Sequence, residues 1–349
     1  MTRLAVLAGL IFAGLSTPAL AAPAAGAGFG EWQASCDNTL VCSAIGGTSY
    51  NATPIYLQID RGAGPGDRPT LMLGTQIGFG DPRPRSVLMR IEGADGAVLY
   101  ERRLALPADQ GSLYRLRLPA TGPLLAAIRN GARLRLIGEG VDEGYVVKLD
   151  GSSAALRWID ERQRRAGTVT ALVARGTAPA SSAPPPLAPL IRRAPAVSQA
   201  HLPADPPAFV LAATADCEAD GRSQAVYRLS PGKLMWLVTC NSVAGYNTGV
   251  MMYVTDEAGR RLTLPPIDHG FEDADDEADV TPDQGGSNLE YDPRTRTLRA
   301  AFYGRGMRDT GWRVEWTWDG HAFRRSLLAS SGDEHATYDW PASYRARIH

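Results

Sequence analysis

Short apolar runs separated by turn residues dominate the second half of the chain, and this pattern predicts a mainly β protein. The runs pair off around turn residues, and Asp319-Gly320 is the strongest hairpin dipeptide in the chain. Because no long helical pattern interrupts these hairpins, the sheets are expected to be antiparallel. Strands are expected over residues 226–229, 234–239, 250–255, 261–264, 289–291, 298–303, 312–318 and 323–328.

The first half shows the same pattern with helical segments added. A short helix is expected over residues 123–130, because proline occupies its first turn and glycine follows its last. A second, amphipathic helix is expected from a cap at Ser152 or Ser153 to Arg165. Strands are expected over residues 29–35, 41–45, 55–59, 71–73, 87–91, 98–104, 113–118, 133–137 and 145–149.

A proline-rich stretch over residues 176–207 divides the chain. It contains nine prolines with many alanines and serines, a composition that cannot bury a core and favours a semi-rigid linker. Roughly 330 residues of mature chain suit two domains of ordinary size. We therefore expect two antiparallel β domains, at residues 22–175 and 208–349, with one or two helices packed on the first.

The N-terminus has the features of an export signal. Arg3 precedes an apolar run over residues 4–15 that is too short to span a bilayer, and the small residues of Ala19-Leu20-Ala21 suit a signal peptidase. Residues 1–21 are therefore expected to be removed; a retained membrane anchor is the alternative. No later segment is apolar over a length that could cross a membrane, so the mature protein is expected to be periplasmic or secreted.

The charged residues do not indicate a nucleic-acid partner. Residues 22–175 carry 18 Lys or Arg against 15 Asp or Glu, whereas residues 206–349 carry 15 against 21. Nearly all the basic residues are arginines, which would suit phosphate recognition. No basic cluster is interleaved with aromatic residues as a nucleic-acid-binding face requires, so we attribute the arginine content to genomic composition.

Four cysteines, at positions 36, 42, 217 and 240, follow the export signal. An oxidising compartment makes disulfides the expected state, although four cysteines allow three pairings. Cys36 and Cys42 do not have the Cys-x-x-Cys spacing of thiol oxidoreductases, and no histidine lies near them to complete a metal site. A structural clip across a tight turn is the favoured interpretation of this pair.

An acidic stretch over residues 268–283 contains eight acidic residues in sixteen. Asp273, Asp275, Glu277 and Asp279 alternate in sequence and could offer oxygen ligands to calcium. The pattern departs from the EF-hand loop, because it lacks glycine at the sixth position and glutamate at the twelfth. The alternatives are a solvated acidic loop and a docking patch for a basic partner.

Three tryptophans, Trp312, Trp316 and Trp318, are evenly spaced along one predicted strand and so share a face. They could form a stacking platform for sugars or peptides. The favoured interpretation is a stripe that packs into the core, because aromatic area stabilises sheet packing.

Polar candidates for recognition lie at two further places. Arg305 and Asp309, near a Gly-Arg-Gly segment, could bind an anionic ligand or could pin a turn through an internal ion pair. Tyr246 and Asn247 follow Cys240 closely, so a disulfide there would hold them rigidly.

No catalytic constellation or cofactor motif is present. The five histidines are scattered, and no serine lies on a Gly-x-Ser-x-Gly elbow. Paired carboxylates for glycoside hydrolysis cannot be recognised without coordinates. The protein is therefore not expected to be an enzyme or to hold a cofactor.

Several motifs occur in a defined order. The first half contains Trp32, Cys36-Asp37-Asn38 and the segments 153–163 and 168–176; the second contains Gly245-Tyr246-Asn247, Gly304-Arg305-Gly306 and Trp316-x-Trp318-Asp319-Gly320. This order resembles the bacterial exported family known as domain of unknown function 1176, over nearly all of the mature chain. The opening Trp and Cys and the Ala-Ala-Leu helix resemble, more weakly, the invasion-associated locus B proteins, which are exported, β-rich envelope proteins. Neither resemblance implies an enzyme activity.

One departure from the family pattern bears on the disulfides. In that pattern the Gly-Arg-Gly segment continues into Gly-Asp-Cys-Gly, and another cysteine follows near the C-terminus. Here Thr310 replaces the first of these cysteines and residues 330–335 contain none, as expected if the two normally pair with each other. The resemblance therefore implies that the four remaining cysteines pair as Cys36–Cys42 and Cys217–Cys240.

Together these features predict a non-catalytic envelope protein that acts by binding an envelope protein or a glycan. Two alternatives remain open: a hydrolase with a site between the domains, and a calcium-stabilised structural or adhesion module.

Overall fold

A computed structural model describes residues 24–48, 55–77, 84–107, 113–138, 141, 145–180, 185–217, 223–243, 246–268, 286–332 and 337–349. The protein is mainly β with antiparallel sheets, as the sequence pattern predicts. None of the helices in the described residues has the length and apolar character that a membrane crossing requires. We call residues 24–180 the N-terminal half and residues 185–349 the C-terminal half.

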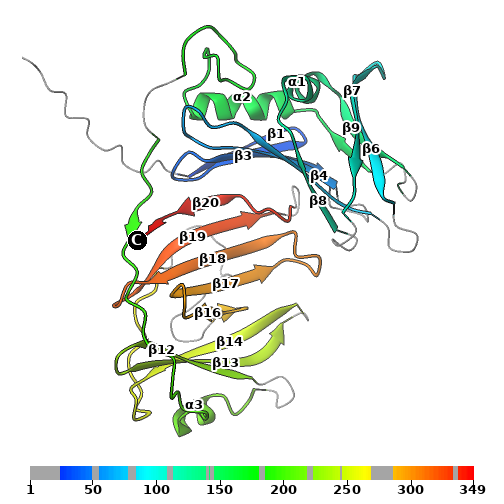
Figure 1. Cartoon of the computed structure of the whole chain (residues 1–349). Helices are drawn as coiled ribbons and strands as arrows, with labels where there is room; N and C mark the ends of the chain where they lie inside the picture. Colours follow the sequence, from blue (N-terminus) through cyan, green and yellow to red (C-terminus); the bar gives the residue numbers. More distant parts are fainter. Residues whose placement is uncertain are drawn as a thin grey trace, which may run out of the picture.

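Two antiparallel sheets form the N-terminal half (Figure 1). The larger contains, in spatial order, β1 (Ala25–Phe29), β2 (Trp32–Cys36), β3 (Cys42–Thr48), β4 (Ile55–Arg61), β5 (Thr70–Gln76) and β8 (Leu113–Leu118). The smaller contains β10 (Val146–Lys148), β9 (Arg133–Ile137), β6 (Ser86–Glu92) and β7 (Val98–Ala105).

Helices α1 (Gly122–Asn130) and α2 (Ser152–Arg162) lie on the side of the larger sheet that faces away from the C-terminal half (Figure 1). Helix α1 has proline in its first turn and is followed by Gly131, as predicted. The expected cap of α2 is wrong. Its N-cap is Gly151, at φ +90°, and the Ser152 hydroxyl instead donates a hydrogen bond to the Ile128 carbonyl at 2.9 Å, which ties α2 to α1.

Trp32 anchors the core of the N-terminal half. Its fully buried ring lies across Gly46 of the neighbouring strand, where a β-carbon would come within 2.3 Å of the ring. Its indole nitrogen donates to the Lys148 carbonyl at 3.0 Å. The tryptophan before Cys36 is therefore a core residue that requires glycine opposite it.

Two further antiparallel sheets share the main core of the C-terminal half. Helix α3 (Ala208–Ala213) covers the other face of the first, where Val210 packs against Trp236. The turn at Asp319-Gly320 joins β18 to β19, as predicted. The first sheet contains β12 (Gln224–Ser230), β13 (Lys233–Val243), β14 (Asn247–Thr255) and β15 (Gly286–Ser287); the second contains β16 (Glu290–Asp292), β17 (Thr297–Tyr303), β18 (Gly311–Trp318), β19 (Phe323–Ser331) and β20 (Ala342–Arg345).

Part of the proline-rich stretch is anchored to the C-terminal half. Strand β11 (Leu190–Ile191) pairs in parallel with β21 (Arg347–Ile348) at the end of the chain. The backbone N–H of Ala194 donates to the Trp318 carbonyl at 2.9 Å, and the Ala194 side chain is buried in the core. These residues therefore form part of the packed structure of that half.

A buried carboxylate fixes the segment that follows α2. Asp160 is fully buried and accepts hydrogen bonds from the backbone N–H groups of Leu172, Val173 and Ala174 at 2.7, 2.8 and 3.2 Å. Three donors at one carboxylate offset the cost of its burial. The segment 171–174 is thereby held against the helix without regular secondary structure.

We expect Asp160→Ala to lower the free energy of unfolding by about 3 kcal/mol, because one buried and two partly buried N–H groups would lose their acceptor. Urea denaturation followed by circular dichroism measures this change. Glu161→Ala is the matched control: the Glu161 side chain is exposed and pairs with Arg157 on the helix surface, so a change within about 0.5 kcal/mol is expected. Equal losses in the two variants would contradict the assignment.

Candidate functional site

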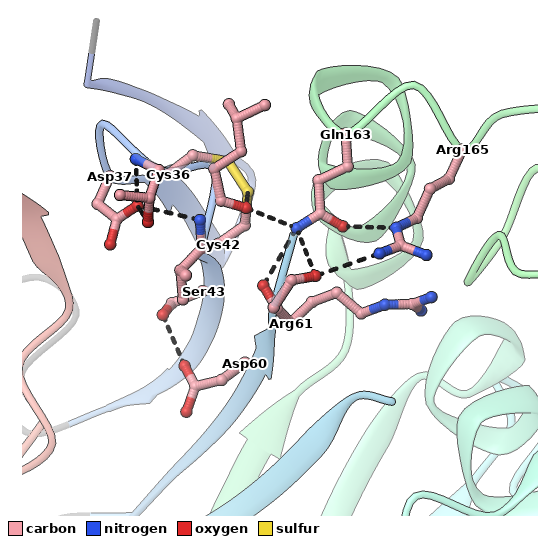
Figure 2. Close-up of a disulfide and its surroundings, with 12 residues drawn as sticks. Cys36, Asp37, Cys42, Ser43, Asp60, Arg61, Gln163 and Arg165 are labelled. Atoms are coloured by element: carbon pink, nitrogen blue, oxygen red, sulfur yellow. Dashed lines mark hydrogen bonds between the residues drawn. A yellow bond between two sulfur atoms is a disulfide. The ribbon is translucent and has the colours of Figure 1, made fainter. Parts of the chain in front are cut away.

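The Cys36–Cys42 disulfide closes the turn between β2 and β3 (Figure 2). Both cysteines are buried. The Asp37 carboxylate accepts hydrogen bonds from the backbone N–H groups of Thr39 and Val41 at 2.8 and 3.0 Å. Because thiol exchange requires access to sulfur, this geometry supports a structural clip and not a redox centre.

Buried polar side chains join the disulfide-closed turn to the end of α2. The Gln163 amide nitrogen donates to the carbonyls of Leu40, Arg61 and Gly62 at 2.8, 3.1 and 3.2 Å, and its oxygen accepts from Arg165 at 3.0 Å (Figure 2). All four contacts lie within the N-terminal half, so these side chains stabilise that half.

Arg61 is a buried cation beside that network. Its Nη2 donates to the Thr170 carbonyl at 2.8 Å. Burial, together with the positive charge of Arg165, lowers the pKa of Arg61 to about 10. The Arg61 side chain is buried and donates to an internal carbonyl, so it offers no open anion site.

The same disulfide-closed turn contacts the C-terminal half. The Asp37 carboxylate, which is 1 % exposed, forms an ion pair with Arg345 of β20 at 2.7 Å. The Asn38 amide donates to the Arg345 carbonyl at 3.0 Å and accepts from its backbone N–H at 2.8 Å. We call the contacts between the two halves the seam.

A second set of seam contacts involves the outer face of β4 and the segment before β20. The Thr337 hydroxyl donates to the buried Gln58 side chain at 3.0 Å, and the Tyr56 hydroxyl donates to Asp339 at 3.1 Å. The Tyr56 ring lies across Gly74, where a β-carbon would come within 2.0 Å of the ring. Burial and the charge of Asp339 raise the pKa of Tyr56 well above its ordinary value.

Tyr338 lies between charged groups of both halves. Burial and the nearby charge of Asp309 raise its pKa to about 12, although Arg305 and Arg115 act in the opposite direction. The Arg115 guanidinium lies over the Tyr338 ring, 5.7 Å from its centroid. The neutral phenol is thus the form that fits the seam.

The tryptophan face packs into the core. Trp316 and Trp318 are fully buried, and their indole nitrogens donate to the Asp268 carbonyl at 2.9 Å and the Ser230 hydroxyl at 3.2 Å. Trp312 is half-buried and stacks on Phe302. A ligand platform is therefore not available at Trp316 or Trp318, because neither ring has exposed surface.

Four other sequence candidates come together at the turn between β17 and β18. Arg305 forms a bidentate ion pair with Asp309, with both distances 2.8 Å, and Asp309 is 1 % exposed. The Tyr246 hydroxyl approaches the Gly304 carbonyl at 3.4 Å. The arginine thus pins its own turn, which is the second of the two roles that its sequence context suggested.

Asn247 connects the two sheets of the C-terminal half. It is buried, donates to the Tyr303 carbonyl at 2.8 Å and accepts from the Tyr303 backbone N–H at 2.9 Å. Asn288, which sequence reasoning missed, donates to Asn247 at 3.0 Å and to the Ala301 carbonyl at 2.9 Å. Its φ of +48° is a conformation that asparagine tolerates, but no sequence signal distinguishes this residue from other turn asparagines.

The second disulfide, Cys217–Cys240, joins the segment after α3 to β13. Both disulfides are those that the family resemblance implied. The candidate calcium ligands Asp273, Asp275, Glu277 and Asp279 lie outside the described residues. Within the described part of the chain, no group of three or more His, Cys, Asp or Glu side chains is arranged to hold a metal ion.

Sequence reasoning also missed a cavity of about 470 Å³ in the C-terminal half. Its walls come from the linker segment 189–192, the turn and strand at 319–325, and two single residues, Asp268 and Tyr344. We call it the linker pocket. Arginines and aspartates predominate among its polar residues, which are Arg192, Asp268, Asp319, His321, Arg324, Arg325 and Tyr344.

Comparison with known proteins supports the resemblance found in the motifs. Residues 27–347 match the family described as "Protein of unknown function (DUF1176)". "Uncharacterized protein YpfG" of Escherichia coli (strain K12) is 26% identical over 371 residues, which cover 96% of this chain and 97% of the relative. The crystal structure of invasion associated protein b from Bartonella henselae covers 40% of this chain and 99% of its own at 17% identity and a TM-score of 0.29, too low to support an argument about fold.

Arg345→Ala should lower the free energy of unfolding by about 1 to 2 kcal/mol, because the buried Asp37 carboxylate would lose its cationic partner at a half-exposed ion pair. Urea denaturation again gives the value. Arg347→Ala removes the same charge from an exposed side chain two residues away and should change stability by less than about 0.5 kcal/mol. If both variants behave like Arg347→Ala, the ion pair does not stabilise the seam.

The free energy of unfolding should also decrease in alkaline solution, because burial raises the pKa of the Tyr338 phenol in the folded protein. The unfolded phenol ionises at its ordinary pKa of 10.0 and the folded one at about 12. Between these values the unfolded state binds fewer protons, so the free energy of unfolding falls as pH rises through the window. Thermal melts of the wild type and Tyr338→Phe over this range test the point: the variant should show the shallower decline, and parallel curves would contradict the role of Tyr338.

Proposed function

The chain belongs to the DUF1176 family, whose members are described as proteins of unknown function, and we propose for it a non-catalytic binding role outside the cytoplasm. Its partner is a component of the cell envelope, either a protein or a glycan.

The disulfides support the proposed compartment. Each of the two described disulfides joins cysteines of the same half, Cys36–Cys42 in the N-terminal half and Cys217–Cys240 in the C-terminal half. The Cys36–Cys42 bridge closes the turn whose Asp37 pairs with Arg345 across the seam. Such structural disulfides form and persist in oxidising compartments and are rare in the cytosol. This agrees with the export signal expected at residues 1–21.

One observation carries the binding role: charged side chains from segments far apart in sequence converge on the linker pocket. Binding sites are characteristically concave, with a few polar groups directed at the ligand. The pocket lies where the linker segment, β19 and the chain end meet, so its shape depends on the assembled fold. The mixed charge of its walls favours a charged partner over an apolar one.

Site-specific photo-crosslinking in the native host tests this proposal. A photoreactive amino acid replaces His321, which is exposed at the pocket, or Arg294, whose side chain is 91% exposed on the turn before β17. We expect a discrete adduct from position 321 alone, seen by gel shift or intact mass. It should disappear when Arg192→Glu reverses a charge in the pocket. Identical adducts at the two positions, or none at 321, would contradict the proposal.

A further inference from the structure

We infer that the Cys217–Cys240 disulfide is a site of reversible thiol–disulfide exchange with a dithiol, and that its reduction releases helix α3 from the sheet beneath it. This site is separate from the linker pocket, and its chemistry does not depend on the binding role proposed above.

The two disulfides differ in how accessible their cysteines are. Cys36 and Cys42 are both buried. In the second bridge Cys217 is buried as well, but Cys240 is half-buried. Exchange begins when a thiolate attacks one sulfur of the bridge, so its rate depends on which sulfur the attacking thiol can reach. Cys240 is therefore the cysteine at which attack is expected.

Cys240 also lies at an irregular position of its strand. The pairing of β13 with β14 shifts register between Thr239 and Asn241, which leaves Cys240 with no residue opposite it in β14. Regular pairing with β12 has already ended on the other side, where Gln224 lies opposite Val238. Because a bulge disrupts the ladder locally, the backbone around Cys240 can adjust when the bridge opens.

The bridge holds a helix that is too short to be stable by itself. Helix α3 has six residues and no side-chain hydrogen bond at its N-cap, and Val210 is its buried residue. Isolated helices of this length do not persist in water. Phe209 adds an edge-to-face contact with Tyr253, with 6.1 Å between the ring centroids. The turn after α3 leads directly into the bridge, because the Cys217 backbone N–H donates to the Thr214 carbonyl at 3.2 Å.

The side chains under α3 form a cluster of their own. Val210 packs against Trp236, Val238 and Tyr253, on the face of β13 and β14 that is turned away from the second sheet (Figure 1). The main core of the C-terminal half lies on the opposite face of these strands and shares no buried residue with this cluster. Helix α3 can therefore leave its place while the two sheets stay packed together.

One dithiol balances the reaction. One of its thiolates attacks the Cys240 sulfur, the S–S bond breaks, and Cys217 leaves as a thiolate that takes up a proton. The second thiol of the reductant then attacks the mixed disulfide at Cys240, so that the reductant becomes a disulfide and both cysteines become thiols. Two electrons pass to the protein, and a disulfide oxidant reverses each step.

Titration of the mature, oxidised protein with dithiothreitol tests which bridge is reduced first. N-ethylmaleimide traps the free thiols, and mass spectrometry of tryptic peptides locates them. Cys217–Cys240 should be half-reduced at a dithiothreitol concentration at least about tenfold lower than Cys36–Cys42, because its attacked sulfur is the more accessible one. Equal susceptibility of the two bridges, or earlier reduction of Cys36–Cys42, would overturn the inference.

Hydrogen exchange of the oxidised and the selectively reduced protein tests the release of α3. The backbone N–H groups of Leu211 and Thr214, which donate to the Pro207 and Val210 carbonyls, should exchange at least about tenfold faster after reduction. Strands β17 and β18 should exchange at unchanged rates, and oxidised glutathione should restore the slow exchange in α3. Faster exchange throughout the C-terminal half would identify a bridge that only holds the fold together, and unchanged exchange in α3 would show that the bridge does not hold the helix; either result overturns the inference.

Two substitutions in α3 give a matched comparison in which both cysteines are kept. Val210→Ala removes the buried contact, whereas Leu211→Ala changes an exposed neighbour on the same helix. A docked α3 keeps the two thiols close together after reduction, so Val210→Ala should lower the dithiothreitol concentration for half-reduction by about tenfold. Leu211→Ala should leave it unchanged, and circular dichroism confirms that each variant is folded. The same midpoint in the wild type and both variants would show that the bridge and the helix are not coupled.

Discussion

The ion pair between Asp37 and Arg345 is the contact through which the disulfide-closed turn is joined to the C-terminal half. A carboxylate that is 1 % exposed is stable only where its oxygens have donors. One oxygen of Asp37 accepts from the backbone of its own turn, and the other accepts from Arg345. The Cys36–Cys42 bridge closes the turn that carries this carboxylate. The disulfide therefore stabilises both its own turn and the contact between that turn and Arg345.

The same strand connects the seam to the linker pocket. Successive side chains of a β-strand point to opposite faces, so Arg345 and its neighbour Tyr344 point in opposite directions. Arg345 reaches Asp37 of the N-terminal half, whereas Tyr344 stacks under Arg325 inside the pocket. Two residues further on, the chain pairs with the linker and closes the other wall. Residues 344–348 thus contribute both to the seam and to the surroundings of the linker pocket.

The local features of the fold could be predicted from sequence, because each depends on neighbours in the chain. The Asp319-Gly320 hairpin and the proline and glycine at the ends of α1 are of this kind. The cap of α2 could not be predicted, since the Ser152 hydroxyl is taken by the Ile128 carbonyl in another helix. The seam and the pocket could not be predicted either. Their partners are separated by up to about three hundred residues, and no periodicity encodes such pairs.

The residues that stood out in the sequence are mostly not those that line the linker pocket. The residues that stood out in sequence are satisfied internally: Arg305 by Asp309, Asn247 by Tyr303, and the indoles of Trp316 and Trp318 by acceptors within the C-terminal half. A motif of this kind maintains the fold, because its polar groups are used in internal contacts. The arginines that line the linker pocket belong to no such motif, and the fold brings them together from the linker and from β19. Their convergence depends on the pairing of segments far apart in the chain and not on a local sequence pattern.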